Sequence, residues 1–345
     1  MSSLSCGIVG LPNVGKSTLF NALCARRLAE TAPRPFTTIE PHEAVVAVPD
    51  ENLEKLWELV RGDPSTSLRM TTPDKIPAVV TFIDIAGLVK GASQGEGLGN
   101  QFLGKIREVD AVIHVVREFT DPNVSHVHNK IDPKEDIEIV NLELQLGGIV
   151  DKPTIYVYNV DEKNVNKKGE GIYPPSRNTE SVCSRIKAKS FSLRRDFAPD
   201  EAWGEDTTTV RSGELYLCVK LEEELMDLSA EERKAYLREL GISQSGLEKL
   251  IQKAYLLLGL ISFYTIKGGK EIHAWSLKNG KTAFDAAAEV HTDFAKNFIK
   301  AEVINVSELL NLGGWKEAKE KGKVRLEGRD YIMKNGDVVE FKIGS

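Results

Sequence analysis

The chain has 345 residues, of which 41% are hydrophobic and 28% charged, and it carries a net charge of −6. This length exceeds one typical hydrophobic core and predicts two or three domains, while the acidic balance does not favour a general nucleic-acid binder or a sequence-specific DNA partner. No apolar run is long enough to cross a bilayer, and residues 1–6 lack the basic segment that opens a signal peptide, so we expect a cytoplasmic protein with no membrane partner.

A glycine-rich loop near the N-terminus carries the first functional signal. Residues 10–17 read GLPNVGKS, between an apolar run at 7–9 that predicts a buried strand and a segment with helical spacing at 18–23. In this context a Walker A pattern binds phosphate, because the loop N–H groups converge at the positive end of a helix. We expect Lys16 to act catalytically at the β- and γ-phosphates and the Ser17 hydroxyl to bind Mg²⁺. The expected nucleotide contacts in this loop are Val14, Gly15, Lys16, Ser17 and Thr18.

A proline-rich loop at residues 33–41 (PRPFTTIEP) lies where a switch segment follows the first helix of such domains. A threonine hydroxyl there can complete the Mg²⁺ shell only when a γ-phosphate is present. We favour Thr38 for this role, with Thr37 second. The alternative is a simple proline-rich connector.

A second phosphate element follows a buried strand. Residues 45–48 predict a strand, residues 51–60 an amphipathic helix, and residues 78–83 an apolar strand that ends at Asp84. An aspartate at this edge of a sheet can hold Mg²⁺ through water, and the N–H of Gly87 can meet the γ-phosphate.

The glycine content of residues 88–102 is too high for a stable helix without support. We interpret this segment as a second switch that orders when a nucleotide or a partner arrives. Leu88 stands where Ras-like enzymes keep a water-orienting glutamine, so catalysis must use another group or wait for a partner.

The apolar run at residues 109–117 predicts a further strand with His114 inside it. Two interpretations of His114 stay open. It is either a hydrogen-bonded core histidine or a catalytic residue that faces the switch and positions the attacking water.

The base-recognition corner departs from the GTPase pattern. A helix is predicted at 133–146 and a strand at 153–158, and the strand ends in the sequence NVDE at 159–162. A GTPase has N-K-x-D there, and the aspartate accepts two hydrogen bonds from guanine. A glutamate in the fourth position cannot take that bidentate geometry without moving the loop, so guanine selection is weakened and ATP is tolerated or preferred. The expected nucleotide contacts at this corner are Asn159, Val160 and Glu162.

Residues 163–214 show little periodicity. Their basic stretch, formed by Lys187, Lys189, Arg194 and Arg195, is either a solvated loop or an RNA contact. Residues 215–219 predict the last strand of the sheet, and residues 218–220 lie where a base-contacting corner belongs.

The last third of the chain changes character. The elements predicted there are helices at 222–240 and 245–258, strands at 264–266 and 272–277, a helix at 282–290, and a closing hairpin of 330–333 with 338–341. We therefore expect an α/β fold, with a P-loop NTPase domain of mostly parallel sheet over residues 1–260 and a separate β-grasp domain over residues 261–345.

With these residues the sequence resembles the Obg-like ATPase (YchF) family. The motifs that carry the resemblance are GLPNVGKST (10–18), PFTT (35–38), DIAGLVKGA (84–92) with GEGLGN (95–100), NVDE (159–162) and HTDF (291–294). The resemblance implies a TRAFAC GTPase-like domain, a C-terminal TGS-like domain, hydrolysis of ATP in preference to GTP, and association with the ribosome.

The resemblance also implies cofactors, and the chain departs from the family pattern in two places. It implies Mg²⁺, and Asn13 matches the P-loop asparagine that potassium-stimulated relatives place around the phosphates, which adds K⁺ as a candidate. The family inserts a coiled-coil arm where this chain has only residues 147–148, and the segment 163–214 is longer than the family's usual connection.

The leading hypothesis is an ATPase switch read by a partner. One alternative is a nucleotide-gated scaffold that hardly turns ATP over, which Leu88 keeps open. Another is a GTPase with relaxed base specificity.

Overall fold

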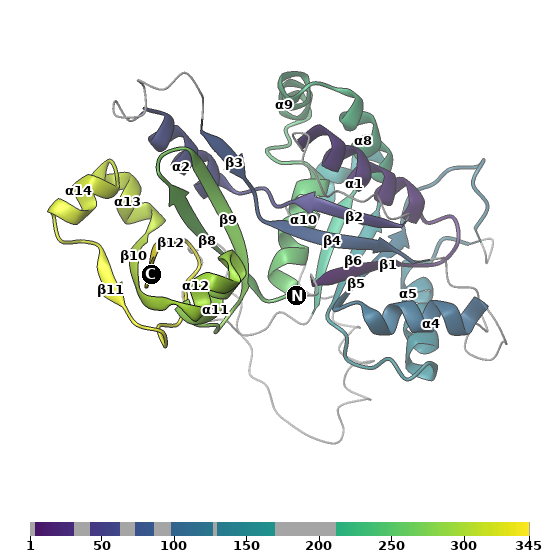
Figure 1. Cartoon of the computed structure of the whole chain (residues 1–345). Coiled ribbons are helices and arrows are strands. Elements are labelled where there is room, and N and C mark those ends of the chain that lie inside the picture. The colour runs from purple at the N-terminus through teal and green to yellow at the C-terminus, as the bar shows by residue number, and fades with distance from the viewer. Residues whose placement is uncertain are drawn as a thin grey trace, which may run out of the picture.

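The computed structural model describes residues 4–30, 42–62, 73–85, 98–126, 130–169 and 212–344. Within these ranges the chain forms two six-stranded sheets, shown in Figure 1. The predicted α/β fold class is confirmed. Several residues singled out in the sequence lie outside the described ranges, namely Thr37, Thr38, Gly87, Leu88 and the basic stretch Lys187 to Arg195.

The first sheet has the strand order β2-β4-β1-β5-β6-β7. Its strands are β1 (Ser5–Val9), β2 (Glu43–Ala47), β4 (Val79–Asp84), β5 (Ala111–Arg117), β6 (Thr154–Asn159) and β7 (Ser212–Leu217). β2 runs antiparallel to β4 and the other neighbouring pairs are parallel, so the sheet is mostly parallel, as predicted. All residues of β1 and β5 are buried, which is typical of central strands covered on both faces.

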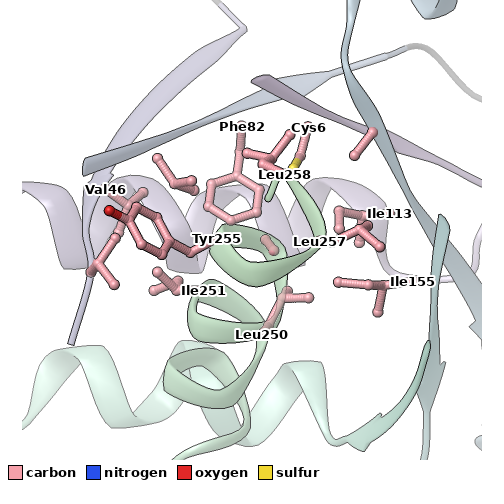
Figure 2. Close-up of a cluster of buried hydrophobic side chains, with 14 of the residues drawn as sticks. Cys6, Val46, Phe82, Ile113, Ile155, Leu250, Ile251, Tyr255, Leu257 and Leu258 are labelled. Atoms are coloured by element: carbon pink, nitrogen blue, oxygen red, sulfur yellow. The ribbon is translucent and has the colours of Figure 1, made fainter. Parts of the chain in front are cut away.

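Helices cover both faces of this sheet (Figure 1). The helices of this part of the chain are α1 (Lys16–Glu30), α2 (Glu51–Gly62), α4 (Leu98–Glu108), α5 (Pro133–Leu146), α6 (Glu162–Gly169), α8 (Val219–Glu224), the 3₁₀ helix η1 (Leu225–Asp227), α9 (Ala230–Glu239) and α10 (Gly246–Leu257). Of these, α2 packs against the second sheet described below. Figure 2 shows Leu250 of α10 in one buried cluster with Phe82 and Ile113 of the sheet. On the opposite face, Asn141 of α5 donates a hydrogen bond to the hydroxyl of Tyr156 (3.3 Å). None of the helices in the described ranges is both long and apolar enough to span a bilayer.

The second sheet has the order β11-β10-β12-β8-β9-β3. Its strands are β3 (Asp74–Ile76), β8 (Leu260–Lys267), β9 (Glu271–Lys278), β10 (Phe298–Asn305), β11 (Arg325–Glu327) and β12 (Asp337–Ile343). The accompanying helices are α11 (Ala283–Val290), α12 (Thr292–Lys296), α13 (Val306–Leu312) and α14 (Trp315–Glu320). A separate apolar cluster joins α11 to one face of the sheet through residues such as Ala286, Phe263 and Val303.

The edge strand of the second sheet comes from the first part of the chain. Residues 74–76 of β3 pair in parallel with residues 271–273 of β9. The predicted domain boundary near residue 260 assigns β3 to the N-terminal domain and stays a prediction. The second sheet, however, is not built from residues 261–345 alone.

A side-chain contact also joins the second sheet to the segment between β2 and α2. The buried Tyr264 of β8 donates a hydrogen bond from its hydroxyl to Oδ2 of Asp50 (2.7 Å). The other oxygen of Asp50 accepts from the N–H groups of Asn52 (2.9 Å) and Leu53 (3.2 Å) at the start of α2. Tyr264 and Ile272 also belong to the same apolar core as the strands of the first sheet.

The single helix predicted at 222–240 is wrong, because the structure has α8, η1 and α9 in its place. The break follows from a new helix start at Ser229. Its hydroxyl accepts from the N–H of Glu232 (3.3 Å), and the Glu232 carboxylate accepts from the N–H of Ser229 (3.0 Å). This capping box favours a fresh N-terminus over continuation of the preceding turn.

The predicted closing hairpin is also wrong. β12 pairs with β10 and β8, whereas Ile332 makes only an isolated bridge to Thr282. The buried Asp337 explains the difference, because its carboxylate accepts from the N–H of Lys334 (2.9 Å) and the hydroxyl of Tyr331 (3.0 Å). These local bonds hold the segment before β12 in a turn, away from a regular ladder.

The helix predicted at 133–146 is confirmed as α5. Asp132 caps its start by accepting from the N–H of Glu135 (3.4 Å), and Pro133 occupies the first helical position. Gly147 ends the helix and Gly148 has a φ of +73°, so the chain turns back directly into β6.

We predict that Tyr264→Phe lowers the free energy of unfolding by about 2 kcal/mol, because Asp50 loses the hydrogen bond that joins the start of α2 to the second sheet. Urea denaturation would measure this loss. The matched control is Tyr158→Phe, whose hydroxyl bonds Glu214 at an exposed site (3.4 Å) and whose removal should change stability by less than about 0.5 kcal/mol. Equal losses in both variants would contradict the role given to Tyr264.

Candidate functional site

The loop between β1 and α1 has the backbone of a phosphate-binding loop. Gly10, Asn13 and Gly15 have φ angles of +151°, +63° and +100°. A Cβ at Gly10 would lie 2.4 Å from the carbonyl oxygen of Val115, and one at Gly15 would lie 2.5 Å from Nδ2 of Asn159. Both glycines are therefore required by backbone conformation and by close neighbours.

Lys16 is folded back onto this loop. Its side chain is 8% exposed, and Nζ donates to the carbonyl oxygen of Leu11 (2.7 Å). Burial lowers the pKa of Lys16 to about 8, although the nearby carboxylate of Asp84 acts in the opposite direction. A buried ammonium at the start of a 15-residue helix is suited to an anionic ligand.

Two of the three predicted metal ligands, Ser17 and Asp84, lie at the same edge of the sheet, and the third, Thr38, lies outside the described residues. Ser17 is exposed in the first turn of α1, and Asp84 is half-buried at the end of β4. The N–H of Asp84 donates to the carbonyl oxygen of His42 (2.9 Å), the first described residue after the proline-rich loop. Within the described ranges no cluster of three His, Cys, Asp or Glu side chains could hold a metal by itself. One carboxylate and one hydroxyl fit Mg²⁺ only when phosphate oxygens add to them.

Asn159 contacts the loop from the end of β6. Its Nδ2 donates to the carbonyl oxygen of Val14 (3.0 Å), and its Oδ1 accepts from the N–H of Val219 at the start of α8 (3.0 Å). The residue is 6% exposed, so both ends of its amide are bonded to the protein itself. Asn159 thus positions the loop, and its direct contact with a base stays a prediction.

Of the other two residues predicted at this corner, Val160 is buried and Glu162 is exposed. Val160 is 1% exposed and donates its N–H to the carbonyl oxygen of Leu217 (2.9 Å). Glu162 begins α6 and is exposed, with Oε1 3.5 Å from the hydroxyl of Tyr236 on α9. Burial raises the pKa of the adjacent Cys218 thiol, and the charge of Glu162 adds to that rise. The elements that meet at this corner are β6, β7, α6, α8 and α9.

His114 lies inside the sheet and is 1% exposed. It pairs with Val9 of β1, and its ring lies 5.4 Å from the ring of Tyr156. Burial, with the charge of Lys16 second, lowers the pKa of His114 to about 3, so the imidazole is neutral at pH 7. Among the residues that the structure describes, Nδ1 of His114 has no hydrogen-bond partner. The location agrees with a core histidine, and the catalytic role stays a prediction.

Sequence reasoning missed the residues that support the loop from β5. Asn13 donates from Nδ2 to the carbonyl oxygen and hydroxyl of Ser125 (3.3 and 3.4 Å). The carbonyl of Ser125 is in turn bonded by the buried Arg117 (3.2 Å). The sequence signal that could have indicated them was Arg117, a charged residue at the end of a buried strand. Thr18 follows on α1 and is partly exposed.

Comparisons with known proteins identify relatives of this chain. The family model described as "50S ribosome-binding GTPase" matches residues 5–160, and YchF-GTPase_C, described as "Protein of unknown function (DUF933)", matches residues 260–344. The chain is similar to "Ribosome-binding ATPase YchF" of Bacillus subtilis, with 41% identity covering 99% of each protein, and to that of Haemophilus influenzae, with 40% identity covering 98% of each. The solved "Structure of the Schizosaccharomyces pombe YchF GTPase" superposes with a TM-score of 0.73 at 28% identity, covering 99% of this chain and 98% of that one.

We predict that Asn159→Asp destabilises the ligand-free protein at least as much as Asn159→Ala, by about 2 kcal/mol or more. A carboxylate at this position would face the carbonyl of Val14 and lose the donor that the amide provides. Thermal unfolding would measure both variants. Asn141→Ala, which removes an exposed amide, is the control and should change little. A fully stable Asn159→Asp protein would show that the bridge to Val14 contributes nothing.

Proposed function

Because this chain belongs to the YchF family, we propose that it is an ATP-hydrolysing molecular switch that prefers ATP over GTP and couples its nucleotide state to a ribosome or another translation-related partner. The observation that carries the proposal is the phosphate-binding loop with its buried Lys16. Hydrolysis of the phosphoanhydride bond is the activity that this loop serves in P-loop NTPases.

The phosphate end of the site rests on charge and on backbone geometry. The Lys16 ammonium donates to a neutral carbonyl of its own loop and is disfavoured by burial. Phosphate oxygens would replace that carbonyl with a negative partner, and the loop N–H groups would add neutral donors. Val14, Gly15 and Thr18 complete the expected contacts.

Mg²⁺ is the cofactor we propose, held by Ser17, Asp84 and Thr38 together with the phosphates. When bound, it would neutralise charge on the phosphate oxygens. The N–H of Gly87 would meet the γ-phosphate. Asn13 is exposed on the loop and is the residue through which K⁺ would act.

The base end of the site supports weakened guanine selection. Guanine recognition requires a carboxylate held for two hydrogen bonds, but Glu162 begins a helix, is exposed, and lies at hydrogen-bond distance from Tyr236. The Asn159 amide is bonded within the protein at both ends. The names of the relatives differ on this point, since one is called an ATPase and another a GTPase.

The proposed output is contact with the ribosome in the cytoplasm. Support comes from the names of the bacterial relatives, which call those proteins ribosome-binding. α5 turns back at residues 147–148, where the family's coiled-coil arm would emerge. The partner would therefore have to contact other surfaces of the protein. The second sheet and the glycine-rich segment after Asp84 are the candidates.

Each of two alternative functions is supported by a specific observation. A neutral, deeply buried His114 and the leucine at position 88 favour a nucleotide-gated scaffold with little turnover. The match to a GTPase family model over residues 5–160 favours a GTPase with relaxed base specificity.

A nucleotide competition titration tests the proposal. We predict that ATP displaces a fluorescent ATP analogue at about tenfold lower concentration than GTP, which corresponds to about 1.4 kcal/mol. Steady-state turnover should be measured alongside, in potassium and in sodium, with and without ribosomes. Lys16→Ala is the control and should abolish binding or turnover.

The outcomes separate the candidates. Binding without hydrolysis, even with ribosomes, would favour the scaffold. Tighter binding of GTP would refute the argument from Glu162. Failure of the intact protein to bind either nucleotide at millimolar concentration would refute the proposed function.

We further predict that nucleotide binding takes up protons above pH 8. The free Lys16 has a pKa of about 8, and an adjacent triphosphate favours its protonated form, so its pKa in the complex must be higher. Affinity should therefore be constant below pH 8 and fall as the pH rises through 8 towards the pKa of the complex. Calorimetry with Mg-ATP at pH 8.5, in two buffers of different ionisation enthalpy, measures the uptake. At pH 7.0 it should be small, and equal uptake at both values would exclude Lys16 as its source.

A further inference from the structure

Arg117 is a buried cation at the end of β5. It is 2% exposed and is among the largest fully buried side chains in the described ranges. Its guanidinium donates to four backbone carbonyls, and its Cζ lies 4.4 Å from the ring centroid of Phe119. The four acceptors are the carbonyl oxygens of Phe119 (3.3 Å), Asp121 (3.4 Å), Val124 (3.0 Å) and Ser125 (3.2 Å).

These bonds give residues 118–126 their shape. The segment contains neither helix nor strand, so its conformation depends on turns and on side-chain contacts. One planar guanidinium gathers carbonyls from both of its ends, which a lysine with a single nitrogen could not do. Hydrogen bonds to a charged donor are also stronger than those between neutral groups.

The segment reaches the phosphate-binding loop through Ser125. The carbonyl of Ser125 accepts from Arg117 and from Nδ2 of Asn13, and the Ser125 hydroxyl is a second acceptor for the same amide. Asn13 has a φ of +63°, a left-handed conformation that asparagine tolerates when its surroundings hold it. The chain of contacts therefore runs from Arg117 through Ser125 to a conformationally demanding position of the loop.

A neighbouring strand supplies a parallel support. Arg117 of β5 pairs with Asn159 of β6, and the N–H of Glu118 donates to the Asn159 carbonyl (2.9 Å). Asn159 holds the carbonyl of Val14, whereas Arg117 acts on Asn13. Consecutive residues of the phosphate-binding loop are thus supported from two adjacent strand ends.

We propose that Arg117 is a positioning residue of the nucleotide site, which sets the affinity for the triphosphate by holding Asn13 through Ser125. This inference rests on the proposed function. Arg117 itself touches no ligand in this scheme. Its contribution is to reduce the number of loop conformations that binding has to exclude.

The test is a double-mutant cycle on ATP affinity. Arg117→Lys and Asn13→Ala are each expected to raise the dissociation constant of a fluorescent ATP analogue about tenfold, which corresponds to about 1.4 kcal/mol. The double variant should bind no more than about twofold more weakly than either single variant, because both changes break the same chain of contacts. Additive effects would show that Arg117 acts elsewhere and would overturn the inference.

Controls separate positioning from general stability. Arg26→Lys alters another buried arginine, which is paired with Glu248 (3.2 Å), and should lower the thermal midpoint without changing ATP affinity. Asn13 and Ser125 are exposed, so their alanine variants should fold even if Arg117→Lys does not. In that case unchanged affinity in Asn13→Ala overturns the inference, and Arg117→Gln replaces Arg117→Lys in the cycle, where non-additive effects with Asn13→Ala support it. Loss of binding in the unaltered protein would instead refute the proposed function.

Discussion

A buried carboxamide holds the phosphate-binding loop in place. Through one side chain, Asn159 joins the carbonyl of Val14 to the N–H of Val219, and so ties the loop to the end of β6 and to the start of α8. An unpaired donor or acceptor would be costly at this depth, so the three elements must keep their spacing. The same closeness leaves no room for a Cβ at Gly15. The loop and the base corner therefore constrain each other.

Among the residues that the structure describes, two buried cations lie at this edge of the sheet, and each donates to a main-chain carbonyl oxygen. Lys16 bonds Leu11, and Arg117 bonds the segment that follows β5. Burial is the main cause that keeps His114 neutral, and the charge of Lys16 is the second. The edge thus combines positive charge with neutral dipoles, an environment in which an anion gains more than it would at an exposed surface. The half-buried carboxylate of Asp84 lies near Lys16 and favours its charged form.

Much of the fold could be predicted from the sequence, because apolar periodicity and the Walker A loop are local signals. The strands of the first sheet and the helix α5 follow from them. The break at Ser229 could also have been predicted, because Ser229 and Glu232 have the spacing of a capping box. The acidic amphipathic pattern around them favoured one continuous helix instead. The pairing of β3 could not be predicted, because its partner β9 is distant in sequence. The hydrogen-bonding partners of Asp337 are local, but its burial depends on tertiary packing and could not be predicted either. At the site, Lys16 and Asp84 come together as the motif predicts, whereas Arg117 gave only the weak signal of a charge within an apolar strand.

The edge strand β3 has a consequence for how the chain is made. Asp74–Ile76 leaves the ribosome long before β9, so during synthesis this short strand has no ladder to join until the last third of the chain has emerged. A fragment that begins at residue 260 would leave β9 as an open edge, able to pair with a second chain. The C-terminal sheet is therefore completed by the N-terminal part of the same molecule, and its solubility as an isolated piece should depend on that contribution.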